Sequence, residues 1–221
     1  MTDDELAQQV AVWLAAGCRG MEIKIGESWG AAADRDLSRV RRLRELVDSS
    51  VAVMVDANGG YSLGQARRIG AALDDLGLVW FEEPVTSDDI AGLDTMRKLL
   101  RCDVAAGEYL SDPDDVRRLI PVVDCVQLDA TRCGGYTGFL AGAAQATAHH
   151  KPVSAHCAPA LHAQLGCLPG LRHIEWFADH ARLEPLLFEG APEVANGMIG
   201  PTAGAGHQMT ISERATRFRV D

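Results

Sequence analysis

Three acidic residues recur at equivalent places along this chain of 221 residues. Each ends an apolar run typical of a buried β-strand: Asp56 in VMVDANG, Glu82 in VWFEEP and Glu108 in VAAGEY, at a regular spacing of 26 residues. Three converging carboxylates repel one another unless a cation neutralises them. Oxygen ligands without nearby cysteine or histidine suit Mg²⁺ better than zinc. Any one of these acids alone is equally consistent with an ordinary turn, but their joint recurrence favours a magnesium site.

Four further strand-like runs also carry ionisable groups at or near their ends. Lys24 closes GMEIKIG, Asp129 closes VQLDA, His156 closes PVSAH, and Glu175 lies in HIEWF. Buried parallel strands rarely end in so many ionisable groups unless a site is there. A lone His156 is more often a core histidine satisfied by a backbone carbonyl. With Asp129 one strand earlier, a catalytic histidine is favoured.

These residues need a scaffold that brings strand ends together. Hydrophobic periodicity predicts strands at residues 20–25, 51–56, 78–82, 104–108, 125–129, 153–156 and 173–176, and helices at 3–16, 34–48, 63–76, 87–100, 113–119, 136–149 and 158–166. Alternating strands and helices imply a parallel sheet, and the lack of a glycine-rich fingerprint disfavours a dinucleotide-binding fold. A closed barrel has eight strands whose carboxyl ends meet at one mouth. We expect a TIM-like α/β barrel of seven strands, without a first strand.

Composition narrows the class of protein. Hydrophobic residues make up 47% and charged residues 24%, as in ordinary globular proteins. The net charge of −10 argues against nucleic-acid binding, and no apolar run is long enough for a membrane helix. The acidic N-terminus is unlike a secretory signal, and the six cysteines form no CxxC pair. We expect a cytoplasmic protein with reduced, mostly buried thiols that forms a homo-oligomer.

The motifs taken in order resemble one known family. MEIKIG, VMVDANGGY, WFEEP, AAGE, QLDATRCGG, VSAHCAPALH and HIEWF are similar to successive strand-end motifs of the enolase superfamily, from about residue 11 to residue 205. Asp129 and His156, at the sixth and seventh strands of a complete barrel, resemble the mandelate racemase subgroup. The muconate-lactonizing subgroup would carry a lysine at the sixth. The resemblance implies a (β/α)7β barrel that is truncated at its N-terminus.

The resemblance also implies a reaction on a small-molecule carboxylate. Mg²⁺ held by the three recurring acids would bind the substrate carboxylate and stabilise the enediolate formed when its α-proton leaves. His156 would be the general base or acid, and Asp129 would orient its imidazole. Glu175 would contact the substrate carboxylate, and Glu22 and Asn58 are expected to bind substrate.

The chain departs from the family pattern at its first strand. A KxK pattern is usual there, whereas this chain reads Glu22-Ile23-Lys24. Positions i and i+2 of a strand share one face, about 7 Å apart, so we expect Glu22 and Lys24 to form a close pair. Glu22 should then raise the pKa of Lys24 and make it a poor base, which favours one-base chemistry by His156. We expect Glu83 to face away from the site, because adjacent strand residues point to opposite sides.

Nothing in the sequence resembles the family's N-terminal capping domain. We expect the catalytic barrel to span residues 1–205, and residues 206–221 to form a segment that would return toward that domain. Dehydration of an acid sugar or another hydroxy acid is the favoured reaction. Racemisation or epimerisation α to a carboxylate is one alternative, and a non-catalytic barrel fragment is another.

Overall fold

Seven parallel strands form one curled sheet in the computed structural model, which describes residues 2–219. The strands follow each other in chain order, so each pairs only with its neighbours in the sequence. Their bounds are β1 (Gly20–Lys24), β2 (Ala52–Asp56), β3 (Trp80–Glu82), β4 (Asp103–Ala106), β5 (Cys125–Leu128), β6 (Val153–Ala155) and β7 (Leu171–Ile174). This confirms the expected barrel of seven strands, with β1 and β7 as its two edges.

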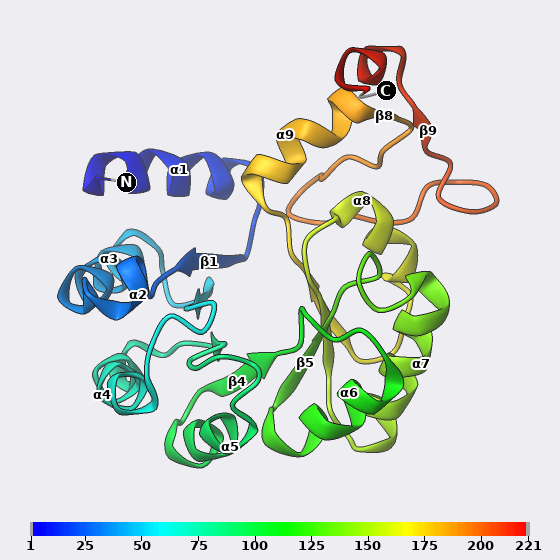
Figure 1. Cartoon of the computed structure of the whole chain (residues 1–221). Helices are drawn as coiled ribbons and strands as arrows, with labels where there is room; N and C mark the ends of the chain where they lie inside the picture. Colours follow the sequence, from blue (N-terminus) through cyan, green and yellow to red (C-terminus); the bar gives the residue numbers. More distant parts are fainter. Residues whose placement is uncertain (1, 220–221) are drawn as a thin grey trace.

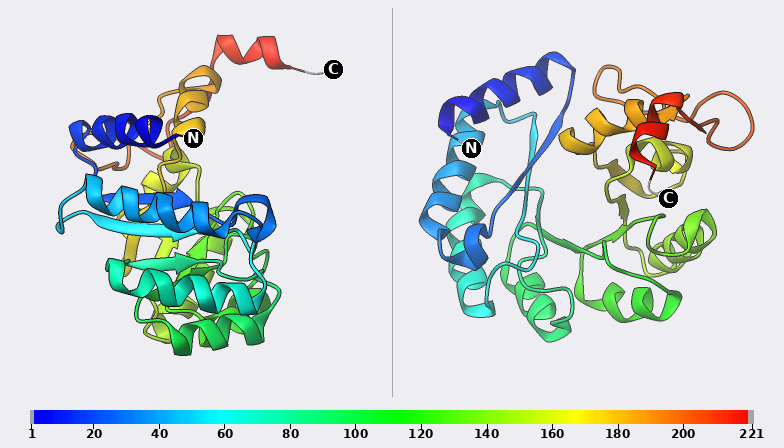
Figure 2. Two further views of the ribbon diagram at one scale, coloured as in Figure 1. Left: turned by 90° about the vertical axis from the view of Figure 1, so that its left-hand side faces the viewer. Right: turned by 45° about the horizontal axis from the view of Figure 1, so that its top comes forward.

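The helices lie outside the curled sheet, most of them along its outer face, whereas α9 (Ala178–Leu187) stands above the sheet beside the C-terminal segment (Figure 1). They are α1 (Asp3–Ala15), α2 (Glu27–Gly30), α3 (Ala33–Leu46), α4 (Leu63–Leu73), α5 (Ile90–Leu99), α6 (Pro113–Leu119), α7 (Gly135–Ala148), α8 (Pro159–His162) and α9 (Ala178–Leu187). Seen from a tilted direction, they form an arc that stays open between α1 and the C-terminal part of the chain (Figure 2). None of the described helices is both long and apolar enough to cross a bilayer.

Local sequence signals explain where several helices begin. The Thr2 hydroxyl accepts the backbone N–H of Glu5, and the Glu5 carboxylate accepts the N–H of Thr2, which caps α1 reciprocally. Ser62 and Gln65 make the same arrangement at the start of α4. Such caps satisfy N–H groups that have no partner within the helix. The helices therefore begin close to the positions that the sequence predicted.

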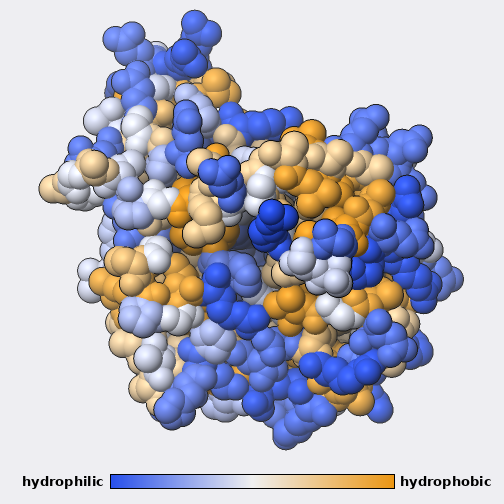
Figure 3. Space-filling model, turned by 180° about the vertical axis from the view of Figure 1, so that it is seen from behind, coloured by the Kyte–Doolittle hydropathy of each residue, from blue (hydrophilic) through white to orange (hydrophobic). Residues whose placement is uncertain are grey.

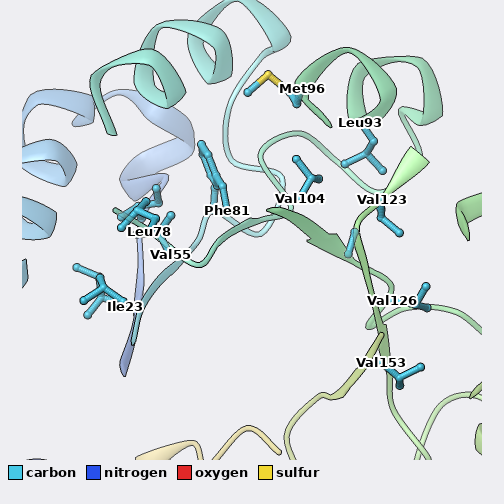
Figure 4. Close-up of a cluster of buried hydrophobic side chains, with 14 of the residues drawn as sticks. Ile23, Val55, Leu78, Phe81, Leu93, Met96, Val104, Val123, Val126 and Val153 are labelled. Carbon is cyan, nitrogen blue, oxygen red and sulfur yellow. The ribbon is translucent and has the colours of Figure 1, made fainter. Parts of the chain in front are cut away.

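The main core lies between the sheet and the helices. Met21 and Ile23 point outward from β1 into this layer, whereas Glu22 and Lys24 point into the barrel, as the period of two requires. Apolar side chains of several strands and helices meet there, including Ile23, Val55, Phe81, Met96 and Val126 (Figure 4). A smaller cluster of Met54, Trp80, Ala105 and Cys125 fills the floor of the barrel. The polar inward residues lie above this apolar floor, toward the mouth.

Strand register places the functional side chains in a row. Lys24 pairs with Asp56 across β1 and β2, and Asp56 pairs with Glu82 across β2 and β3. Glu108 lies two residues beyond the end of β4, after Gly107 with φ of +132°. A Cβ atom on Gly107 would stand 2.4 Å from the carbonyl oxygen of Gln127, so only glycine fits this turn. The turn lets Glu108 reach the mouth beside the other two acids.

The barrel interior is open between its two edge strands. A cleft of about 660 Å³ runs there, lined by residues of α1, β1, β7 and residues 194–199. Viewed from behind, the surface is hollowed near its middle, with hydrophobic patches on both sides (Figure 3). The opening follows from the strand order, because the edges of β1 and β7 have no strand between them.

All six cysteines are free; three are buried, Cys18 and Cys102 are half-buried, and Cys167 is exposed, so only some thiols match the expected burial.

The chain after β7 contains elements that periodicity did not predict. α9 has no buried residue and carries Pro185 within it, so its pattern is weak. Short strands β8 (Phe188–Glu189) and β9 (Thr210–Ile211) pair antiparallel, and Ser212 hydrogen-bonds to Leu186 and Leu187. Residues 206–219 therefore pack against the end of α9. The expected return of this segment toward a capping domain stays a prediction.

We expect the substitution Tyr61→Phe to destabilise the mouth of the barrel. The Tyr61 hydroxyl, 3% exposed, donates to Asp36 Oδ2 at 2.6 Å, and the same oxygen accepts the N–H of Gly26 at 3.0 Å. This buried carboxylate ties the loops after β1 and β2 together, and losing a hydrogen bond to a charged group costs about 1.5–3 kcal/mol. Chemical denaturation measures the change in unfolding free energy. Tyr136→Phe, which loses one bond to the Leu161 carbonyl, is the matched control, and equal losses would contradict this account.

Candidate active site

Three buried carboxylates meet at the mouth of the barrel. Asp56, Glu82 and Glu108 are each at most 2% exposed, and each offers an oxygen within 4.8 Å of the others. Burial raises the pKa of Asp56, and it raises that of Glu82 well above its usual value, with the charges of Glu22 and Asp56 adding to the effect at Glu82. For Glu108, burial is outweighed by the hydrogen bond and charge of His156, and the pKa falls to about 2.

Lys24 contacts Asp56 rather than Glu22, so the expected pair is wrong. The Lys24 ammonium forms an ion pair with Asp56 Oδ2, and Asp56 Oδ1 accepts the N–H of Asn58 at 2.6 Å. Glu22 lies one layer deeper, where its Oε1 accepts the indole N–H of Trp80 at 2.8 Å. Burial lowers the pKa of Lys24, but the charge of Asp56 outweighs this and raises it. The pKa of Lys24 is therefore raised, as expected, but the acid that raises it is Asp56 and not Glu22.

We expect the substitution Glu22→Gln to reduce the loss of unfolding free energy that accompanies a rise in pH. Burial, with the charges of Asp56 and Glu175, raises the pKa of Glu22 from 4.5 to about 8. Between these values the folded state holds a proton that the unfolded state releases, so stability falls as pH rises from about 4.5 to about 8. Glutamine can still accept from Trp80 and does not ionise. Denaturation of both proteins across this range should show the variant gaining relative stability with pH, and parallel curves would exclude this assignment.

His156 stands between two carboxylates at the other end of the row. Its Nδ1 is 3.0 Å from Asp129 Oδ2, and its Nε2 is 2.9 Å from Glu108 Oε2. Burial lowers its pKa, but bonds to Asp129, Cys157 and Glu108 outweigh this and raise the pKa to about 12. Asp129 is held by the backbone N–H and hydroxyl of Thr131, both at 2.7 Å. The dyad therefore has the spacing that sequence analysis expected.

Glu175 reaches the same region from the opposite edge strand. It lies one residue beyond β7, and its Oε2 accepts the backbone N–H of Cys157 at 2.9 Å. The same oxygen is 3.8 Å from His156 Nε2. Asn58, in contrast, is exposed and adopts φ of +42° in the loop after β2. The structure thus gathers Lys24, His156, Asp129 and Glu175 around the carboxylates, with Asn58 at the rim and Glu22 below.

Glu83 faces the site, against the expectation from strand alternation. β3 ends at Glu82, and Glu83 has φ of +38°, so the period of two no longer applies. The residue is 1% exposed, and its Oε1 has no hydrogen-bond partner among the described residues. Burial raises its pKa to about 8, and the charges of Glu108 and Asp56 contribute.

Two further residues near the site carried no clear signal in the sequence. The Arg132 guanidinium donates to the Glu108 carbonyl oxygen at 3.0 Å and lies 3.7 Å from Asp129 Oδ2. His162 is fully buried; its Nε2 accepts the N–H of Ala130 at 2.9 Å, and its Nδ1 is 2.8 Å from the Cys157 carbonyl oxygen. His162 therefore joins the loop that follows Asp129 to the turn that follows His156. In the sequence, the feature that could have indicated this role is the second histidine of the motif HCAPALH, which is His162.

The donor set at the mouth fits a hard divalent cation. The ligand atoms are carboxylate oxygens, which Mg²⁺ prefers, and the three of them are buried within 4.8 Å of one another. Lys24 and Arg132 are the permanent cations that contact this group, whereas the nearby acids number seven: Glu22, Asp56, Glu82, Glu83, Glu108, Asp129 and Glu175. A doubly charged cation would neutralise part of this excess of negative charge.

Comparison with known proteins agrees with this fold. Residues 5–215 match the family model described as "Enolase C-terminal domain-like". The chain therefore belongs to the enolase C-terminal domain-like family, which confirms the resemblance seen in the strand-end motifs.

Individual relatives are considerably longer than this chain. L-talarate/galactarate dehydratase of Salmonella typhimurium (strain LT2) is 30% identical over 221 residues, 97% of this chain and 53% of that protein. A mandelate racemase/muconate lactonizing enzyme-like protein from Rubrobacter xylanophilus superimposes with a TM-score of 0.91 at 37% identity, covering 98% of this chain and 61% of that one. A racemase from Streptomyces coelicolor A3(2), solved with bound magnesium, gives 0.90 at 28% identity, covering 100% and 60%. The chain thus spans about half the length of the dehydratase.

Proposed function

We propose that this chain is the Mg²⁺-dependent catalytic barrel of an enzyme that removes the proton α to a carboxylate and dehydrates a hydroxy acid of the acid-sugar class. The observation that carries the proposal is the row of three buried carboxylates with a histidine–aspartate dyad at one end. The names of relatives support it, since one is a dehydratase of sugar acids and another is a racemase solved with magnesium. Mg²⁺ would be held by Asp56, Glu82 and Glu108 and would supply positive charge for the substrate carboxylate.

The chain's own residues would handle the protons. His156 Nε2 faces the mouth, and the imidazole is placed to take the α-proton once it has released the proton that its raised pKa retains. Its raised pKa favours the imidazolium that results, and Asp129 stabilises this ion through Nδ1. The imidazolium then holds the proton that a leaving β-hydroxyl needs on the same face. One residue would thereby serve as base and as acid.

Lys24 would remain a cation throughout. Its raised pKa keeps the ammonium protonated beside Asp56. In this form it cannot remove a proton, but it can stabilise negative charge on the substrate. Glu175, on the opposite edge strand, is placed to contact the substrate from the side of β7.

Racemisation or epimerisation is the second candidate, favoured by one observation. Lys24 contacts Asp56 at one end of the carboxylate row, and His156 lies beside Glu108 at the other. With Lys24 and His156 at the two ends of the row, a proton removed from one face of the substrate α-carbon can be replaced by a proton delivered to the other face. The high pKa of Lys24 suits the donor role alone, so dehydration is preferred.

Turnover separates the two reactions. The protein should be incubated with Mg²⁺ and a panel of acid sugars, and the products examined for 2-oxo-3-deoxy acids and for inverted α-carbons. Formation of the 2-oxo acid supports dehydration, and inversion without loss of water supports racemisation. Failure of every acid sugar, together with failure to bind Mg²⁺, would reject the proposal.

A further inference from the structure

The thiol of Cys157 lies between two groups of the mouth. Its Sγ is 3.2 Å from His156 Nε2 and 3.3 Å from Glu175 Oε2, and those two atoms are 3.8 Å apart. From these separations, the point equidistant from all three atoms lies about 2.0 Å from each. Bonds from zinc to nitrogen, oxygen and sulfur are about 2.0–2.3 Å long. An ion slightly out of the plane of the three atoms would therefore meet each of them at a bonding distance.

The imidazole is oriented as in metal-binding histidines. Asp129 Oδ2 lies 3.0 Å from Nδ1, so a proton on Nδ1 is shared with a carboxylate, and Nε2 is left to face the Cys157 thiol, Glu175 and the nearby Glu108 Oε2 at 2.9 Å. Metal-ligating histidines commonly donate their second ring N–H to a carboxylate, which orients the ring and strengthens the ligand. The orientation of the imidazole is an observation separate from the distances among the three ligand atoms, and both observations indicate a metal ion at this place.

The site is mostly buried but borders the cleft. His156 is 6% exposed and Cys157 9%, whereas the Glu175 side chain is 19% exposed and lines the cleft. Cys157 has φ of +48°, in the turn where β6 gives way to α8, and this turn carries its thiol to the same side as the histidine. The Cys157 backbone N–H also holds Glu175 in place. The ligand atoms are thus positioned before any ion arrives.

We propose that His156, Cys157 and Glu175 form a second metal site, beside the carboxylate row and with its own three ligands, which binds a thiophilic divalent cation of the zinc class. Nitrogen, sulfur and oxygen donors with an open fourth position suit zinc, whereas a thiolate ligand disfavours Mg²⁺. Binding releases to solvent both the thiol proton and the proton that the raised pKa of His156 keeps on Nε2, and the ion then occupies Nε2. Because Nε2 is the atom proposed above to carry the substrate proton, an ion here turns the reaction off. The binding itself does not depend on the proposed reaction.

Cadmium is the probe, because its bond to a thiolate absorbs in the ultraviolet. Mg²⁺ is kept saturating so that the carboxylate row is filled, and Cd²⁺ is then titrated into the purified chain. We expect one equivalent to bind with a cadmium–thiolate band in the wild-type protein and in Cys167→Ser, which removes an exposed thiol outside this site. Cys157→Ala should lose the band and bind more than about 100-fold more weakly.

A variant outside the three ligands tests the orientation of the ring. Asp129→Asn should keep the thiolate band but weaken cadmium binding by about 10- to 100-fold. Circular dichroism verifies that each variant is folded, and Glu175→Gln, with weaker binding and an intact thiol, replaces Cys157→Ala if that protein does not fold. A wild-type protein without the band, or a band that disappears with Cys167 and persists without Cys157, would overturn the site.

Discussion

Saturating Mg²⁺ is expected to stabilise this chain, and the substitution Glu82→Gln is expected to abolish that stabilisation. An ion at about 100 times its Kd adds about 2.7 kcal/mol to the free energy of unfolding. Glu82 lies beside Asp56, and burial, together with the charges of Glu22 and Asp56, raises its pKa well above the usual value. Glutamine removes the charge of Glu82, so the metal-free variant should be at least as stable as the metal-free wild type. Thermal unfolding with and without Mg²⁺ measures both effects, and calorimetry measures binding.

The adjacent acid provides the control for this experiment. Glu83→Gln removes an equally buried carboxylate that lies outside the row of three. It should keep most of the response to Mg²⁺, because the three oxygens that meet at the mouth remain. If Glu82→Gln responds to Mg²⁺ as the wild type does, the row is not the magnesium site. If both variants lose the response, Glu83 is a ligand as well.

His156→Asn is expected to slow exchange of the substrate α-proton with solvent by about 10²- to 10⁴-fold, the range in which general acid–base catalysis contributes. Asparagine cannot exchange a proton at the position of Nε2, which faces Glu108 and the mouth. Asp129→Asn should have a smaller effect, because it removes the partner of Nδ1 and leaves the ring in place. The measurement is deuterium incorporation from D₂O into an acid sugar that the wild-type protein turns over.

Binding must be separated from proton transfer in that experiment. The response to Mg²⁺ should be retained in His156→Asn, since the three carboxylates are unchanged. His150→Asn, at an exposed position beyond the end of α7, should exchange at the wild-type rate. Wild-type exchange in His156→Asn would show that another group removes the proton, and Lys24 would be the next residue to test.

Sequence periodicity was sufficient to predict the strand order and the residues at the mouth. It placed the acids, the histidine and their scaffold together, because equivalent positions in successive units of a parallel barrel share one end. The predicted strands ran slightly too long where the chain turns toward the mouth. Asp129, His156 and Glu175 each lie one residue beyond a strand, and Glu108 lies two beyond. The backbone N–H groups of His156 and Glu175 still donate to the neighbouring strand, to the carbonyl oxygens of Leu128 and Ala155 at 2.9 Å, so the sheet guides both residues to the mouth.

Interactions within the site were less predictable than the scaffold. The pairing of Lys24 with Glu22 was inferred from positions i and i+2, about 7 Å apart on one strand. A neighbour across a strand pair is only about 4.8 Å away. Asp56 occupies that nearer position by register, and it therefore holds the ammonium. Strand alternation likewise failed for Glu83, because its left-handed backbone follows the end of β3. The register between strands and the turns after them depend on the tertiary structure, so the alternation of residues along one strand cannot predict them.

The strand order makes this sheet a row, whereas a closed barrel is a ring. In a row, each inner strand pairs with two neighbours and each end strand with one, and the first unit is held in addition by Gly197, which donates to the Ala16 carbonyl oxygen at 2.9 Å. Stability in such arrays is approximately a sum of local interfaces, so fraying begins at the ends, and hydrogen exchange is fastest there. The proposed magnesium ligands lie on inner units β2 to β4, and the dyad follows inner strands β5 and β6, whereas Lys24 and Glu175 belong to the end units. Partial opening would therefore release the groups proposed to touch substrate while the carboxylate row stays assembled.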